Sequence, residues 1–332
     1  MSLLFTPIHL PSPRGGLMLP NRIVVAPMCQ YAASAGEPSD WHLMHWGNLL
    51  NSGAALFTIE ATAVVPEGRI TPACLGLWDD RTEAAMTSVL QRARALAPHT
   101  AVCIQLAHAG RKASSALPWS GAQLLPPKQG GWETYGPSAL PHLSDESPPT
   151  AMTRAHMDQV RDAFVAAARR ADRMGIDAIE LHGAHGYLLH EFVSPVSNQR
   201  TDEYGGSFEN RIRYPLEVFA AVRRAYTGVL GMRISATDWV EGGWDVEQSA
   251  EMAKQLKALD CDFIHVSTGG LSPLQKIVLA PGYQLPFAER IRAETGLPTI
   301  GVGLVTEAEH AEEIVAKGQA DLVGIARAVL YN

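Results

Sequence analysis

Residues 157–183 read "MDQVRDAFVAAARRADRMGIDAIELHG". Up to Gly175, apolar residues recur every three or four positions among charged ones, which predicts an amphipathic helix. The run that follows from Asp177, "DAIELHG", is short and almost continuously apolar. Such a run is typical of a strand that is covered on both faces, as in a parallel sheet. The stretch therefore predicts one helix–strand unit of an α/β protein.

The same alternation continues through the whole chain. Eight runs resemble buried strands, and they are "NRIVVAPM" from Asn21, "ALFTIEATAV" from Ala55, "AVCIQLAHAG" from Ala101, "DAIELHG" from Asp177, "GVLGMRISATD" from Gly228, "DFIHVSTGG" from Asp262, "LPTIGVG" from Leu297 and "ADLVGIARAV" from Ala320. Amphipathic helices separate them, such as "EHAEEIVAKG", which we expect to end at Gly318. Eight α/β units in about 300 residues predict a (β/α)8 TIM barrel. A doubly wound open sheet is the alternative that periodicity alone does not exclude.

Three regions depart from this alternation. We expect residues 1–20 to form a short N-terminal cap beneath the barrel. Residues 111–150, rich in Pro, Gly and Trp, predict a long loop after the third strand, over the active-site face of a single domain that spans residues 1–332. The sequence stops at "ARAVLYN", so an eighth helix is missing. We expect either a shortened sequence, which we favour, or a neighbouring chain that covers the gap.

Composition and charge exclude several classes of protein. The 332 residues are 46% hydrophobic and carry a net charge of −7, which predicts a globular protein that does not bind nucleic acid. The N-terminus does not resemble a signal peptide, and no run of about 18 apolar residues predicts a membrane span. The four cysteines form no C-x-x-C pair, so we expect reduced thiols, a cytoplasmic location and no structural zinc.

Catalytic groups of a (β/α)8 barrel gather at the C-terminal ends of its strands. The predicted strand ends supply polar or reactive residues, namely Cys29, Tyr31, Glu60, Gln105, His108, Arg233 and Arg327. They supply few carboxylates, which argues against metal–carboxylate hydrolysis and against paired-carboxylate glycoside chemistry. The glycines near the last two strand ends, together with Arg327, are compatible with a phosphate site, but also with ordinary tight turns.

The fourth strand ends in "ELHGAHGYLLHEF", residues 180–192, which holds three histidines and a tyrosine. His182 and His185 would point to opposite faces of a regular strand, so they converge only if the backbone turns between them. The glycines of "HGAHG" make such a turn plausible. A metal-binding histidine pair is the alternative, but no further ligand is close in sequence, so we predict no metal. We expect His190 to face packing or solvent and assign it no role.

Several motifs together resemble a known family. They are "APMCQYAASAGEPSDWHLMH", "EATAVVPEGRIT", "IQLAHAGRKA", "HGAHGYLLHEFVSPVSNQRTDEYGGSFENRIR" and "ISATDW". The chain resembles the Old Yellow Enzyme family of FMN-dependent ene-reductases. It is most similar to the bacterial branch of thermophilic-like or xenobiotic-reductase-like NADPH dehydrogenases. The resemblance extends from Asn21 to Leu330, nearly the whole chain.

The resemblance implies an oxidoreductase in which NADPH reduces FMN and the reduced flavin then passes hydride to an activated alkene. His182 and His185 match the pair that holds the carbonyl or nitro oxygen of the alkene. Tyr187 matches the proton donor of the family. Tyr31 matches a tyrosine of this branch that hydrogen-bonds the same oxygen.

The resemblance also implies a non-covalent flavin site. Ala26, Pro27, Met28 and Cys29 match the segment along the flavin ring, in which the cysteine tunes the redox potential. The remaining matches are Ala61 at the ring, Gln105 at its pyrimidine edge, Arg233 near N1 and O2, and Gly303, Ala326 and Arg327 at the phosphate. We expect a homo-oligomer, dimer or tetramer, although the C-terminal tail with which relatives reach a neighbouring subunit is not in this sequence.

Three alternative functions are less well supported. Dienoyl-CoA reductases and amine dehydrogenases of the same family bind an iron–sulfur cluster through clustered cysteines, and this sequence has no such cluster motif. A barrel that only binds a ligand would have no need of the intact His, His, Tyr set. A metal-dependent hydrolase lacks its ligands in this sequence.

Overall fold

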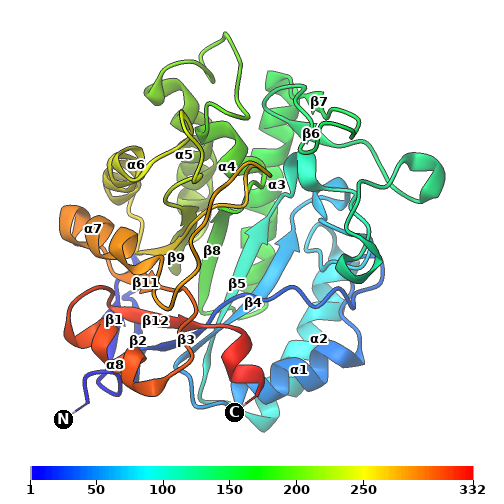
Figure 1. The fold of residues 1–332 in the computed structure, drawn as a ribbon. Coiled ribbons are helices and arrows are strands. Elements are labelled where there is room, and N and C mark those ends of the chain that lie inside the picture. The colour runs from blue at the N-terminus through cyan, green and yellow to red at the C-terminus, as the bar shows by residue number, and fades with distance from the viewer. Residues whose placement is uncertain (1, 332) are drawn as a thin grey trace.

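The computed structural model describes residues 2–331. Eight parallel strands pair in a closed ring, which confirms the predicted TIM barrel and excludes the open sheet (Figure 1). Each predicted run contains one barrel strand. In chain order the strands are β3 (Ile23–Val25), β4 (Leu56–Ala63), β5 (Ala101–Ala107), β8 (Ala178–Gly183), β9 (Val229–Ser235), β10 (Phe263–Ser267), β11 (Thr299–Gly301) and β12 (Leu322–Ile325).

Helices surround the ring of strands and connect them. Those that link consecutive strands are α1 (Asp40–Leu50), α2 (Asp80–Leu96), α3 (Arg154–Arg173), α5 (Phe208–Ala225), α6 (Val246–Ala258), α7 (Leu285–Thr295) and α8 (Ala308–Ala316). A short additional helix, α4 (Leu188–Val193), lies between β8 and α5. After β12 the described chain forms only the 3-10 helix η5 (Arg327–Leu330) and no eighth outer helix, as the sequence predicts.

The helix ends follow from local sequence. At the start of α3, the Thr153 hydroxyl accepts a hydrogen bond from the His156 N–H at 3.2 Å, which satisfies one of the free amides of the first turn. At the end of α8, Gly318 adopts a φ of 71°, where a side chain would be strained. Its N–H donates to the Val315 carbonyl at 3.0 Å, so this glycine ends the helix as predicted.

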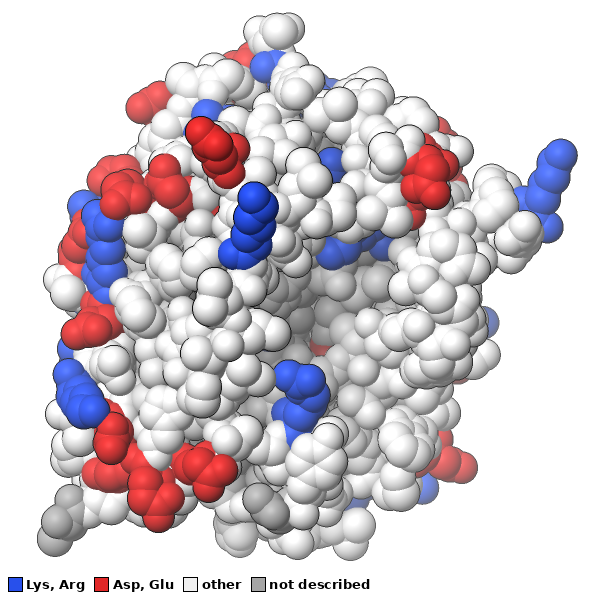
Figure 2. Space-filling model, in the orientation of Figure 1, with Lys and Arg blue, Asp and Glu red and all other residues white. Residues whose placement is uncertain are grey.

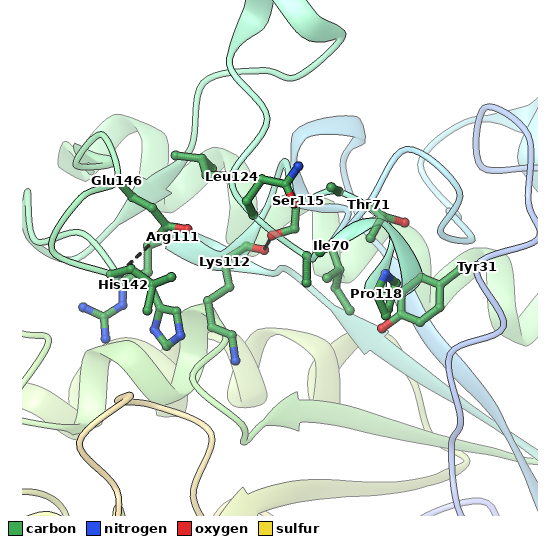
Figure 3. Close-up of a pocket in the computed structure, with 15 residues that line it drawn as sticks. Tyr31, Ile70, Thr71, Arg111, Lys112, Ser115, Pro118, Leu124, His142 and Glu146 are labelled. Carbon is green, nitrogen blue, oxygen red and sulfur yellow. Dashed lines mark hydrogen bonds between the residues drawn. The ribbon is translucent and has the colours of Figure 1, made fainter.

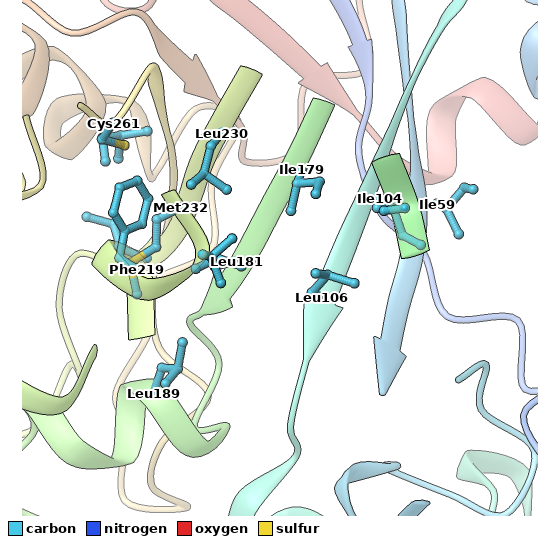
Figure 4. Close-up of a cluster of buried hydrophobic side chains, with 14 of the residues drawn as sticks. Ile59, Ile104, Leu106, Ile179, Leu181, Leu189, Phe219, Leu230, Met232 and Cys261 are labelled. Atoms are coloured by element: carbon cyan, nitrogen blue, oxygen red, sulfur yellow. The ribbon is translucent and has the colours of Figure 1, made fainter. Parts of the chain in front are cut away.

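The main hydrophobic core fills the space between barrel and helices. Figure 4 shows apolar side chains from the strands, such as Leu181 and Leu230, facing Phe219 of α5. These three side chains are fully buried. Burying one side chain of this size contributes about 1.5–3 kcal/mol, and the core contains several dozen such residues, so it dominates the stability of the barrel.

The N-terminal residues close the bottom of the barrel. Strands β1 (Ile8–Leu10) and β2 (Leu17–Leu19) form an antiparallel hairpin. Leu10 and Leu19 are fully buried in a second cluster with residues near the starts of the barrel strands. The predicted cap is therefore present, and it leaves the opposite end of the barrel for the site.

The opposite end is framed by long loops. The segment after β5 contains η2 (Gly110–Lys112), η3 (Pro118–Ser120) and η4 (Pro127–Gln129), and a parallel pair formed by β6 (Tyr135–Gly136) and β7 (Thr150–Ala151). The 3-10 helix η1 (Pro66–Gly68) follows β4. Figure 2 shows a deep hollow in the middle of this face, with basic side chains beside it. In the described residues no helix is long and apolar enough to cross a membrane.

Candidate active site

The barrel carries the candidate residues to one end. Arg233 and His182 lie side by side in the register of β9 and β8. Gln105 lies in β5 beside Glu180 of β8. The other candidates follow strand ends: Ala26, Pro27, Met28, Cys29 and Tyr31 come after β3, Gly303 comes after β11, and Ala326 and Arg327 come after β12. The mouth of the barrel thus brings together residues that are up to 300 positions apart.

The turn after β8 gathers the two histidines and the tyrosine. His185 has a φ of 60° and Gly186 a φ of 73°, so the backbone turns at these two residues, whereas Gly183 still belongs to β8. The ring centroid of His182 lies 5.3 Å from that of His185 and 4.9 Å from that of Tyr187. Both pairs are edge-to-face, so the three rings form one compact cluster at the end of the strand.

His182 presents a defined hydrogen-bond donor. Burial and the nearby charge of Arg233 lower the pKa of His182 well below its ordinary value, so the ring is neutral at pH 7. The N–H of Ala184 donates to its Nδ1 at 3.3 Å. Because a neutral imidazole has one protonated nitrogen, the proton lies on Nε2, which is then a donor.

His185 is held by the neighbouring strands. Its backbone N–H donates to Ser235 Oγ at 2.9 Å, and its Nε2 lies 2.7 Å from Ser267 Oγ. Burial and Arg233 also lower the pKa of His185 well below its ordinary value. The Ser267 hydroxyl also lies 3.1 Å from Gln284 Oε1, to which it donates. Only in the tautomer in which this hydroxyl donates to His185 Nε2 instead does the neutral ring carry its proton on Nδ1 and donate there.

Tyr187 lies beneath a lysine from the loop after β5. The Nζ atom of Lys112 lies 5.1 Å from the centroid of the Tyr187 ring. It also donates to the carbonyls of His185 and Gly270, both at 2.9 Å, and so ties together the turns after β8 and β10. Burial raises the pKa of Tyr187 far above its ordinary value, so the phenol keeps its proton at neutral pH.

Arg233 is a buried cation without a bonded partner. It is 9% exposed, and its Nε has no hydrogen-bond partner in the described part of the chain. A buried arginine is costly unless another group satisfies it. This guanidinium at the barrel mouth therefore suits a ligand that brings acceptor atoms or negative charge.

The segment after β3 lies against β4 at the point where the pairing of β4 with β5 is irregular. Pairing of β4 with β5 shifts between Ile59 and Thr62, so Glu60 and Ala61 lie in an irregular stretch of the strand. Glu60 Oε2 accepts a hydrogen bond from the Gln30 N–H at 2.9 Å, which holds the residue after Cys29 against β4. Burial and the nearby carboxylate of Glu60 raise the pKa of Cys29, so the thiol is not ionised at neutral pH.

Tyr31 connects the site to a side cavity of about 350 Å³. Figure 3 shows Tyr31 at one side of this cavity and Lys112, Arg111 and His142 at the other. Trp119 packs edge-on against Tyr31, with ring centroids 6.0 Å apart. Part of the long loop thus lies directly beside the predicted substrate residue.

The predicted phosphate residues come from two adjacent strands. Gly303 is buried with a φ of 131°, a conformation that favours glycine, and its carbonyl accepts a hydrogen bond from the Gly282 N–H at 2.7 Å. Ala326 precedes η5, and the exposed Arg327 begins it. β11 and β12 are paired, so these residues share one edge of the mouth.

Comparison with known proteins identifies the family. The family described as NADH:flavin oxidoreductase / NADH oxidase matches residues 3–332. The chain belongs to the Old Yellow Enzyme family. An NADPH dehydrogenase from a Geobacillus species is 41% identical over 334 residues, which cover all of this chain and 92% of the relative. One from Bacillus licheniformis is 41% identical over 331 residues, which cover 99% and 91% of the two chains.

Solved structures of the Old Yellow Enzyme family agree with this assignment. Morphinone reductase superposes with a TM-score of 0.79 at 28% identity, and the match covers 98% of this chain and 86% of that one. Its complex with tetrahydroNAD gives a TM-score of 0.78 at the same identity and coverage. The full-length similarity makes this chain an oxidoreductase of the NADPH dehydrogenase type.

Membership in the Old Yellow Enzyme family implies a flavin and a nicotinamide cofactor, and the residues present fit a flavin. The unpartnered Nε of Arg233 suits the electron-rich part of the ring. Gln105 offers an amide, and Ala26 and Ala61 contribute only small side chains to this end of the barrel. Gly303 and Arg327 provide a turn and a cation for a phosphate. FMN would be held by these residues.

Several residues around the site were missed by the sequence reasoning. Lys112 was not singled out, although "GRKA" follows a predicted strand end. His190 is fully buried, in agreement with the packing alternative, but it also has a role that was not predicted: its Nδ1 accepts from the Gly186 N–H at 2.9 Å and its Nε2 lies 2.8 Å from Asp238. Glu180 lies in the motif of residues 180–192, but the sequence predicts no role for it. Apart from the Gly186–His190 bond, their partners are distant in sequence, so no local signal could have found them.

Proposed function

We propose that the chain is an FMN-dependent NADPH dehydrogenase and ene-reductase that reduces the C=C bond of α,β-unsaturated carbonyl or nitro compounds. When bound, FMN would accept hydride from NADPH and deliver it to the β carbon of the alkene. The observation that carries the proposal is the cluster of His182, His185 and Tyr187, with ring centroids 4.9–5.3 Å apart, beside the buried Arg233.

The two histidines suit the activating oxygen of such an alkene. Both rings are neutral. His182 offers its Nε2–H, and His185 offers its Nδ1–H to the same acceptor in the tautomer whose Nε2 accepts from Ser267. Two fixed donors stabilise an oxygen that gains negative charge as hydride adds at the β carbon. Tyr31, across the mouth, is a further hydroxyl within the same space.

Tyr187 suits the role of proton donor. Its phenol stays protonated at neutral pH, and its ring packs against His182. As the β carbon receives hydride, the α carbon takes the proton from the hydroxyl, and solvent later returns a proton to the phenolate. The nearby ammonium of Lys112 would stabilise the phenolate in the interval.

The proposal is tested by an anaerobic absorption titration with NADPH and then cyclohexenone. Flavin bands that bleach with NADPH and return with the enone would support it. A flavin that is not reoxidised by the enone would refute the substrate class, and a protein that binds no FMN would refute the proposal as a whole.

Tyr187→Phe separates the two half-reactions. We expect reoxidation by cyclohexenone to slow by roughly 10²- to 10⁴-fold, the usual range for loss of a general acid, while reduction by NADPH changes little. Stopped-flow absorption measures both rates. Equal slowing of both would show that the tyrosine only shapes the pocket.

A further inference from the structure

The barrel contains a buried acid that the proposed reaction does not use. Glu180, in β8, is fully buried. Its Oε1 accepts a hydrogen bond from Gln105 Nε2 at 2.7 Å, and its Oε2 lies 2.6 Å from His265 Nδ1. Burying a carboxyl group costs free energy unless its oxygens are hydrogen-bonded, and here both are.

The surroundings of Glu180 favour its charged form. Burial opposes ionisation, but His265, Arg233 and Gln105 outweigh it and hold the pKa of Glu180 below its ordinary value. Burial and Arg233 lower the pKa of His265, so that ring is neutral at pH 7 and acts as a hydrogen-bond donor through Nδ1. The carboxylate is thus the negative partner of the Arg233 charge.

The charge of Glu180 fixes the orientation of Gln105. An ionised carboxylate can only accept hydrogen bonds, so the amide atom that faces it must be the nitrogen. The carbonyl oxygen of Gln105 then points to the other side of the amide. The two residues are direct neighbours in the register of β5 and β8, so the strand pairing also fixes their separation.

His265 completes the arrangement from the other side. Its protonated Nδ1 holds the second carboxylate oxygen, and its Nε2 is buried without a partner in the described residues. His265 is the register neighbour of Arg233 on β9. Amide, carboxylate, guanidinium and imidazole therefore come from the successive barrel strands β5, β8, β9 and β10, below the mouth.

We propose that Glu180, held by His265, is a positioning residue for the flavin. It turns the carbonyl oxygen of Gln105 toward the ring edge, where the imide N–H of an isoalloxazine is the matching donor, and its charge balances that of Arg233. This inference rests on the proposed function, since it assumes that FMN binds at the mouth.

Glu180→Gln tests the inference against a matched control, Glu191→Gln. Glu191 is also fully buried, on α4, but lies outside the flavin residues. Apoprotein is titrated with FMN by quenching of flavin fluorescence. We expect Glu180→Gln to weaken FMN binding by roughly ten- to a hundredfold, as for loss of a hydrogen bond to a charged group, because the Gln105 amide can then turn over. Glu191→Gln should stay within about twofold of wild type.

The reduction potential of bound FMN supplies a readout that a merely structural role would not change. Without the Glu180 charge, Arg233 would favour the anionic reduced flavin more strongly, so the potential of Glu180→Gln should become more positive. Glu180→Asp keeps the charge, but the shorter side chain places the carboxylate farther from Gln105. That variant should bind FMN more weakly at a potential close to that of wild type.

Each outcome decides the matter. If Glu180→Gln matches Glu191→Gln in both affinity and potential, the positioning role is refuted while the proposed function stands. If Glu180→Gln does not fold, as judged by thermal unfolding of the apoprotein, Glu180→Asp decides, and wild-type affinity in that variant refutes the role. If wild type itself binds no FMN, the proposed function is wrong and the inference fails with it.

Discussion

At the scale of single residues, the site depends on keeping polar groups neutral or fixing their protons. Burial lowers the pKa values of His182 and His185 and raises that of Tyr187, so at neutral pH each ring nitrogen or hydroxyl has one defined use. In water the same residues would exchange between donor and acceptor states. The barrel mouth converts ordinary side chains into oriented donors.

His182→Ala and His185→Ala should each weaken the binding of a phenol that competes with the substrate. We expect a loss of roughly tenfold or more per histidine, because a buried ligand oxygen loses one of its two donors. Titration of the flavin absorption band with phenol measures the dissociation constant. His156→Ala on α3, whose ring packs on Tyr135 away from the site, is the control. Unchanged affinity in both site variants would refute their role.

Glu191 should make stability depend on pH. Burial raises its pKa from 4.5 to about 8. Between these values the folded protein binds a proton that the unfolded chain has lost, so the free energy of unfolding falls as pH rises from about 5 to 8. Glu191→Gln removes this titration. As pH rises over that range, the unfolding free energy of the variant should therefore increase relative to that of wild type, by on the order of a few kcal/mol.

Urea unfolding of both proteins at pH 5, 6, 7 and 8 would measure the effect of Glu191. A difference between the two proteins that is constant with pH would mean that the carboxyl has an ordinary pKa despite its burial.

At the scale of elements, the β8–α4 turn determines where the chemistry lies. Gly186 has a φ of 73°, and a Cβ there would overlap the carbonyl oxygen of Gly270. Its N–H donates to His190, which is itself paired with Asp238 in the loop after β9. The turn is therefore anchored to two neighbouring loops through both its shape and its hydrogen bonds.

Gly186→Ala should destabilise the protein and disturb Tyr187, and Gly206→Ala is a matched control. Gly206 has a φ of 81° but nothing within 4 Å of an added Cβ. We expect Gly206→Ala to cost about 1 kcal/mol of unfolding free energy from backbone strain alone. Gly186→Ala should cost clearly more and also weaken phenol binding. If denaturant unfolding shows the same loss of unfolding free energy in both variants, and phenol affinity is unchanged, the turn tolerates a side chain.

At the scale of the whole molecule, predicted flavin residues follow both the first and the last strand of the barrel. Those after β3 belong to the first barrel strand and those after β12 to the last, and the two strands pair to close the ring. The Ala26 N–H donates across this seam to the Ile325 carbonyl at 2.9 Å. A ligand that contacts both sides of the seam should stabilise the closed barrel.

FMN should therefore raise the unfolding temperature of the apoprotein in a concentration-dependent way. At free FMN about a hundredfold above its dissociation constant, the gain should be about 2.7 kcal/mol, or several degrees. Differential scanning fluorimetry with FMN, and with riboflavin as the analogue without phosphate, measures it. Riboflavin should stabilise less if Gly303, Ala326 and Arg327 bind the phosphate, and equal stabilisation would argue against that site.

The sequence by itself determined the order of the elements and the location of the chemistry. Alternating helices and buried strands are local patterns, so eight of them predicted a barrel, but only the pairing of β12 with β3 excluded the open sheet. The motif at residues 182–187 likewise contains its own turn, since positive φ occurs within it, at His185 and Gly186. Both are properties of residues close together in the chain.

Only the tertiary structure decided the partners of those residues. Glu180 meets Gln105 and His265 across 75 and 85 positions, and Lys112 reaches the carbonyl of Gly270 across 158. Such pairs depend on strand order and on register, and a shift of one residue would turn every side chain of a strand to its other face. Burial, which sets the protonation of each group, also arises only when the barrel closes. Local sequence therefore predicts which groups are present, and closure of the barrel determines what each one can do.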